Sequence, residues 1–228
     1  MNNIYVPTIG AADWQRLLAE PEKHWKPGYS AHALATCWER ASGLPPEVRS
    51  LFVPHFSEVE LLMAIPEFKV PLPGGTRESQ NDLFCLLRAD GLPMVLMVEG
   101  KVEEPFDKPL GEWLARPSDG RRERLSFISQ TIGLQQPIPP AIRYQLLHRT
   151  ASAVITARRF GANKGAMVVH SFSQFKSWLA DFKAFVGLWN AQVDHDQMIR
   201  VVLPDGFELF LGWATGELVT GDTQAKKL

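Results

Sequence analysis

The chain has few cysteines and no long apolar run, and its first residues do not have the pattern expected of a secretory signal. Cys37 and Cys85 both lie inside apolar runs, which suits buried thiols in a reducing compartment better than a disulfide framework. The longest apolar stretch, from Met94 to Val98, is far too short to span a bilayer. The first residues lack the basic and apolar segments of a signal peptide. These absences predict a cytoplasmic protein with no membrane contact.

The chain also lacks an excess of charge and any internal repeat. Its net charge is −1 at pH 7, so no global positive field attracts nucleic acid, and only a local basic groove could do so. Arg121, Arg122 and Arg124 supply one candidate patch, although such arginines commonly form only a solvated helix face. Without repeats, repeat architectures are not expected. The ordinary composition predicts a single domain over residues 1–228.

Three short apolar runs in the middle of the chain predict consecutive β-strands over residues 59–70, 82–89 and 94–102. The last two runs show no alternation of apolar and polar residues, so helices are expected to cover both faces of these strands. Neighbouring strands without a crossover helix between them must pair as hairpins. The sequence therefore predicts an antiparallel arrangement at this point of the sheet.

Helical periodicity predicts helices on both sides of these strands, from Ser30 to about Ala41 and from about Ala141 to Phe160. Later patterns predict a strand over 166–170, an amphipathic helix over 173–189 and a strand over 207–213. The expected fold is α/β (α+β), with a mixed central sheet flanked by helices. We expect a lead-in over 1–29, a core over 30–172 with the order helix, three strands, helix, strand, and a C-terminal helix and strand over 173–228.

A short hairpin is expected to bring two acids together. Asp90-Gly91 is a strong signal for a two-residue turn, and the register that it sets places Asp82 opposite Glu99. Their side chains would leave the same face of the sheet with Cβ atoms roughly 5 Å apart. Lys101, two residues beyond Glu99, lies on that face as well.

Two carboxylates this close repel each other and are costly to bury, and a divalent cation relieves both problems. Oxygen ligands suit Mg²⁺ or Mn²⁺, which keep several waters and could hold a phosphate with its attacking water. Lys101 would stabilise charge on that phosphate or help to deprotonate the water. A salt bridge between Lys101 and one acid is the plainer alternative.

Two other acid-x-Lys triplets occur in the chain. Asp181-Phe182-Lys183 falls in a predicted helix, where residues two apart do not share a face. Glu67-Phe68-Lys69 falls in a predicted strand, but no upstream acid stands at a distance that a hairpin would allow. Only the triplet Glu99-Gly100-Lys101 has a registered acid opposite it.

The segment Gln80-Asn81-Asp82, a hydrophobic hairpin and then Val98-Glu99-Gly100-Lys101 resembles the PD-(D/E)XK (restriction-endonuclease-like) nuclease superfamily, in an uncharacterised bacterial branch. The order of elements expected between residues 30 and 172 is similar to that of its core. The resemblance implies that Asp82 and Glu99 bind the metal and that Lys101 is the catalytic lysine. Asn81 departs from the motif, which has a proline at this position.

The predicted helix after the motif carries a polar stripe formed by Gln145, His148, Arg149 and Ser152. The resemblance implies that Gln145 approaches the site, as a glutamine does in RecB-like members, whereas a solvated helix face is the other interpretation. Arg143, His148 and Arg149 are further candidates for contact with nucleic acid. Glu39, in the first predicted helix, is either an extra metal ligand or a surface glutamate.

Three functions are compatible with these residues. The first is a Mg²⁺- or Mn²⁺-dependent nuclease that cuts DNA or RNA, with a homodimer as one way to reach both strands of a duplex. The second is a catalytically silent interaction or nucleic-acid-binding module on the same fold, which the near-neutral net charge favours. The third is a metal hydrolase for a small phosphoester, with the same residues in a narrower pocket.

Overall fold

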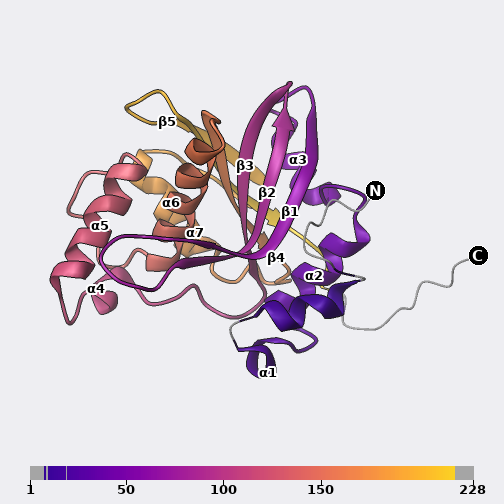
Figure 1. Ribbon diagram of the computed structural model, residues 1–228, viewed down its shortest axis with the longest axis horizontal. Helices are drawn as coiled ribbons and strands as arrows, with labels where there is room; N and C mark the ends of the chain where they lie inside the picture. Colours follow the sequence, from indigo (N-terminus) through magenta and orange to yellow (C-terminus); the bar gives the residue numbers. More distant parts are fainter. Residues whose placement is uncertain (1–7, 9, 19, 219–228) are drawn as a thin grey trace, which may run out of the picture.

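The computed structural model describes residue 8, residues 10–18 and residues 20–218 (Figure 1). The predicted lead-in over 1–29 and the C-terminal unit over 173–228 therefore each include positions outside the described residues. Within the lead-in, a 3₁₀-helix, η1 (Ala11–Leu17), is followed by the short helix α1 (Pro21–His24). Among the helices in the described part of the chain, none combines the length and apolarity needed to cross a membrane.

A six-stranded mixed sheet forms the centre of the molecule, with the strand order β1-β2-β3-β4-β6-β5. The β3–β4 and β4–β6 pairs are parallel and the other three are antiparallel. This confirms the predicted mixed sheet. The strands are β1 (Val59–Val70), β2 (Ser79–Ala89), β3 (Leu92–Lys101), β4 (Lys164–Ser171), β5 (Gln197–Val202) and β6 (Glu208–Thr215).

Helices cover both faces of the sheet (Figure 1). Along β3, Met97 packs into the hydrophobic core beneath one group of helices, and Leu96 packs into the core on the opposite face. The first group consists of α5 (Asp119–Thr131), α6 (Tyr144–Arg159) and α7 (Leu179–Val186), with the shorter α4 (Leu110–Trp113) and η2 (Gly187–Trp189) at its margin. The second consists of α2 (Ser30–Arg40) and α3 (Pro46–Phe52). The prediction that β2 and β3 are buried between helices is confirmed.

The register of the β2–β3 hairpin is the predicted one. Its pairs run from Ala89↔Leu92 to Leu83↔Val98, so that Asp82 and Glu99 come one step beyond the last pair. Asp90 and Gly91 both have positive φ angles, of 45° and 81°, as a type I′ turn requires.

Two predictions for the C-terminal unit are wrong. The helix does not extend over 173–189, because the Ser173 hydroxyl accepts hydrogen bonds from the backbone N–H groups of Phe175 (3.2 Å) and Ser177 (3.1 Å) and so stabilises a turn. The helix begins only at Leu179, after the left-handed residue Trp178. The unit also contains two strands rather than one, since the short strand β5 pairs with β6 at the edge of the sheet.

Candidate functional site

Three carboxylates form a row across the first three strands of the sheet. The pairs Pro66↔Leu83 and Phe68↔Asn81 place Glu67 beside Asp82, and the β2–β3 register places Asp82 beside Glu99. All three line one pocket of about 570 Å³ together with Lys101, Gln145 and Arg149. We call Glu67, Asp82 and Glu99 the acid row, and this space the acid pocket.

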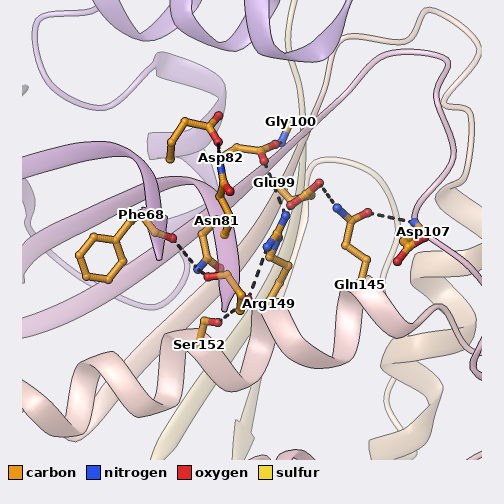
Figure 2. A network of polar contacts seen from close by, with 12 residues as sticks. Phe68, Asn81, Asp82, Glu99, Gly100, Asp107, Gln145, Arg149 and Ser152 are labelled. Atoms are coloured by element: carbon orange, nitrogen blue, oxygen red, sulfur yellow. Dashed lines mark hydrogen bonds and ion pairs between the residues drawn. The ribbon is translucent and has the colours of Figure 1, made fainter. Parts of the chain in front are cut away.

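Glu99 is the most heavily engaged member of the acid row (Figure 2). Its Oε1 accepts hydrogen bonds from Lys101 Nζ at 2.9 Å and from Gln145 Nε2 at 2.7 Å, and its Oε2 accepts one from Arg149 Nε at 2.6 Å. Only 2% of its surface is exposed. Burial alone would raise the pKa of Glu99, but the charges of Arg149 and Lys101 outweigh it and lower the pKa.

Arg149 reaches from α6 towards both Glu99 and Asp82. Its Nη2 lies 3.8 Å from Asp82 Oδ1, while Asp82 Oδ2 accepts a hydrogen bond of 2.8 Å from the backbone N–H of Gly100 (Figure 2). Burial, followed by the charge of Glu99, raises the pKa of Asp82 to about 7. The guanidinium therefore partly neutralises two acids from a position between them.

Glu67 was not among the predicted site residues. Burial and the charge of Asp82 raise its pKa to about 8, and its Oε2 accepts a hydrogen bond of 2.6 Å from Gln80 Nε2. The signal in the sequence was the triplet Glu67-Phe68-Lys69. The partner acid was expected only before this triplet, whereas the acid beside Glu67 in the sheet is Asp82, which follows it in the chain. Fully ionised, the acid row would carry three negative charges against the two positive charges of Lys101 and Arg149.

The polar stripe on α6 faces the sheet rather than solvent. Arg149 is 8% exposed and Ser152 is fully buried, and the Ser152 hydroxyl donates to Ser79 Oγ at 2.8 Å. His148 Nδ1 lies 2.7 Å from the same hydroxyl oxygen. Burial and the charge of Arg149 hold the pKa of His148 well below its ordinary value, so this side chain is neutral near pH 7. The interpretation of the stripe as a solvated face is wrong.

The other predicted arginines do not join the acid row. Arg122 pairs with Asp119 at 2.5 Å, and Arg143 pairs with Asp181 at 2.7 Å. Arg121 and Arg124 bind backbone carbonyl groups around a different pocket. Glu39 accepts a hydrogen bond of 2.8 Å from Trp14 Nε1 and is not among the residues that line the acid pocket.

A second polar cluster lies on the opposite face of the sheet. Among the residues that the structure describes, Cys37, Glu47 and His170 form the only group of three His, Cys, Asp or Glu side chains whose donor atoms lie within 4.8 Å of one another. The distances to Glu47 Oε1 are 3.4 Å from Cys37 Sγ and 2.9 Å from His170 Nε2. We call these three residues and Trp38 the relay.

The hydrogen bonds of the relay argue against a metal ion at this position. The indole N–H of Trp38 can only donate, and it lies 3.2 Å from His170 Nδ1, which therefore accepts. Burial lowers the pKa of His170, so the ring is neutral and its single proton sits on Nε2, directed at Glu47. A metal ion bound at Nε2 would have to displace this proton, and Nδ1 could take the proton only if the Trp38 N–H turned away.

Comparisons with known proteins identify a family but no relative of established activity. No curated protein and no solved structure matches the chain. A family described as a domain of unknown function (DUF6946) matches residues 7–218, which include every strand of the sheet and the whole acid pocket. The chain therefore belongs to the family DUF6946.

Proposed function

We propose that this protein is a metal-dependent phosphodiesterase of the nuclease type, built on a restriction-endonuclease-like core and acting on DNA or RNA. The observation that carries the proposal is the convergence of Asp82, Glu99, Lys101 and Gln145 on one pocket at the end of the β2–β3 hairpin. The hairpin supplies both acids from one sheet face, and α6 supplies Gln145. The resemblance in sequence motif supports the same assignment.

The donor set of the acid pocket suits a hard divalent cation such as Mg²⁺ or Mn²⁺. Half-buried carboxylates with raised pKa values, as at Asp82 and Glu67, gain most from a neighbouring positive charge. Asp82 and Glu99 would hold the ion, with water and substrate oxygens completing its coordination. The ion would neutralise phosphate charge and acidify a bound water. Room for it requires the Arg149 guanidinium to turn away from Asp82.

The protein's own side chains have defined parts in such a reaction. Lys101 is 4% exposed, and its Nζ lies 2.9 Å from Glu99 and 5.2 Å from the centre of the Phe106 ring, so the ammonium group is held at the floor of the pocket. From there it can donate to a phosphate oxygen. Gln145 donates to Glu99 and accepts from the backbone N–H of Asp107 at 3.2 Å, which fixes the orientation of the Glu99 carboxylate.

A catalytically silent binding module is the second candidate, and a specific observation favours it. The Arg149 guanidinium already lies between Asp82 and Glu99, and both oxygens of Glu99 accept hydrogen bonds from protein groups. In this state the protein supplies a positive charge of its own where a metal ion would bind. A module that only binds would keep Arg149 in this place permanently.

Variants of the two central residues test the proposal. Asp82→Asn and Lys101→Met should each reduce Mn²⁺-dependent cleavage of DNA or RNA by at least about 10²-fold, the usual cost of losing one group that stabilises charge in the transition state. Lys183→Met is the matched control, because Lys183 belongs to an acid-x-Lys triplet on α7, pairs with Asp194 and lies outside the acid pocket.

Calorimetry with Mn²⁺ separates the two candidates. Cleavage that persists in Asp82→Asn or Lys101→Met removes the case for a nuclease. A wild-type protein that neither binds Mn²⁺ nor cleaves nucleic acid supports the silent module.

A further inference from the structure

A second pocket, of about 470 Å³, lies near the acid pocket at the N-terminal end of α6. It is bounded by the segment from Leu72 to Ser79, by α4 and by the first two turns of α5. Four basic residues contribute to its lining, and we call it the basic pocket. They are Arg77, Lys108, Arg121 and Arg124.

Two guanidinium groups of the basic pocket are held in place without being neutralised. Arg124 donates from Nε to the carbonyl oxygen of Pro73 at 2.7 Å and from Nη2 to that of Leu72 at 3.2 Å. Arg121 donates from Nη1 to the carbonyl oxygens of Trp113 and Arg116 at 2.8 and 2.9 Å. Carbonyl groups fix a guanidinium in position but carry no net charge, so both arginines keep their positive charge for another anion.

The remaining charges of the basic pocket leave a positive excess. Lys108 pairs with Glu112 at 2.7 Å, so these two residues cancel each other. Arg77, Arg121 and Arg124 then face only Glu78 and Asp107 among the lining residues. The aromatic ring of Trp113 supports Arg121 from 5.5 Å, which limits the freedom of the guanidinium before any ligand arrives. The pocket is prepared for an anion.

The basic pocket and the acid pocket meet at the start of α6. Asp107 lines both, and its backbone N–H donates to Gln145, which in turn donates to Glu99. Deeper in the molecule, Ser79 Oγ lies 3.4 Å from Arg149 Nη1, so one hydroxyl group connects the two pockets. The linings of the two pockets are therefore adjacent.

We infer that the basic pocket binds the phosphate groups of a polynucleotide strand that flank the one at the acid row. This inference rests on the proposed function, and it assigns the substrate class as a polynucleotide chain rather than a small phosphoester. A small phosphoester presents one phosphate and needs only the acid pocket. A chain carries a phosphate at every nucleotide, and its neighbouring charges need cationic partners that the acid row cannot supply.

Binding without metal tests the inference separately from catalysis. Fluorescence anisotropy in EDTA would follow fluorescein-labelled oligothymidylate and oligouridylate of about 12 nucleotides, which distinguish DNA from RNA, beside a labelled thymidine dinucleotide. Arg77→Ala and Arg121→Gln should each weaken oligonucleotide binding roughly fivefold to tenfold at low salt and reduce the slope of log K against log salt by about 0.7. The dinucleotide should bind weakly, with little response to either variant.

Arg88→Ala is the matched control, because Arg88 is an exposed arginine that pairs with Glu60 and lies outside both pockets. The Arg77→Ala variant is expected to fold normally, because Arg77 is exposed and lies in the segment between β1 and β2, so weaker binding by this variant would not be due to misfolding. Wild-type affinity in both Arg77→Ala and Arg121→Gln, or equal affinity for dinucleotide and oligonucleotide, overturns the inference. Binding that depends on these arginines, with no cleavage in Mn²⁺, would instead support the inference about the basic pocket and contradict the proposed nuclease activity.

Discussion

Two polar clusters, the relay and the acid row, lie on opposite faces of the same sheet. They differ in how far their hydrogen bonds and charges are balanced within the protein. In the relay, the side-chain N–H groups of Trp38 and His170 and the S–H group of Cys37 each donate to an acceptor, and the one carboxylate, Glu47, remains partly exposed. In the acid row, three carboxylates face two cations, and burial raises the pKa values of Glu67 and Asp82. Since buried charges are normally paired, the unbalanced cluster is the one that points to an external ligand.

The largest expected difference between the clusters concerns their central carboxylates. Glu99→Gln leaves Arg149 and Lys101 without their shared anion and should lower the free energy of unfolding by about 3–5 kcal/mol. Glu47→Gln keeps a carbonyl oxygen that can accept a hydrogen bond from His170, so this substitution should lower the free energy of unfolding by only about 1 kcal/mol. Urea unfolding of the two variants measures both values. Equal losses would mean that the acid row is no more dependent on charge than the relay.

Arg149→Met should increase the affinity of the acid row for a metal ion, because it leaves the three carboxylates with one cation fewer. The substitution keeps an unbranched side chain but removes the cation between Asp82 and Glu99. We expect the protein to become less stable in EDTA and to bind Mn²⁺ at least about tenfold more tightly, equivalent to about 1.4 kcal/mol. Calorimetry and thermal unfolding with and without Mn²⁺ would show this. An unchanged affinity for Mn²⁺ would show that Arg149 does not compete with the metal.

The two clusters should also respond to pH in opposite directions. The pKa of Glu67 rises from 4.5 to about 8 on folding, so between these values the folded state holds a proton that the unfolded state has lost, and stability falls as pH rises. The hydrogen bond from His170 lowers the pKa of Glu47, so its contribution is present above pH 4.5 and is lost as pH falls. Urea unfolding between pH 3 and pH 8 should show a flatter decline above pH 5 in Glu67→Gln and a smaller loss below pH 4.5 in Glu47→Gln, and an unchanged decline in Glu67→Gln would contradict the assignment.

The smallest effect is expected at Cys37. Burial, followed by the charge of Glu47, raises the pKa of this thiol to about 12, so it stays protonated and reacts slowly with iodoacetamide. Cys37→Ala removes one weak hydrogen bond and should cost about 1 kcal/mol or less. Mn²⁺ binding should not change. A loss of Mn²⁺ affinity in this variant would move the metal site from the acid row to the relay.

The β2–β3 hairpin shows what could be predicted from the sequence. The Asp90-Gly91 turn specifies a register by local geometry alone, and the structure has that register. Glu67 could not be placed in the same way. Residues 71–78 connect β1 and β2 without a two-residue turn that would specify the register, and in the structure Arg124 of α5 holds this connection by donating to the carbonyl groups of Leu72 and Pro73.

Local patterns in the sequence determined the elements around the β2–β3 hairpin, but not those of the C-terminal unit. Apolar runs and helical periodicity are short-range properties, and they specify the strands around the hairpin, the helices beside them and the shared face of Asp82 and Glu99. The tertiary structure alone decided the surroundings of those acids, because the direction of the polar stripe on α6 depends on packing between distant segments. That packing brings Arg149 between Asp82 and Glu99 and Gln145 against Glu99, and it therefore sets the charge balance that any function of the pocket must use.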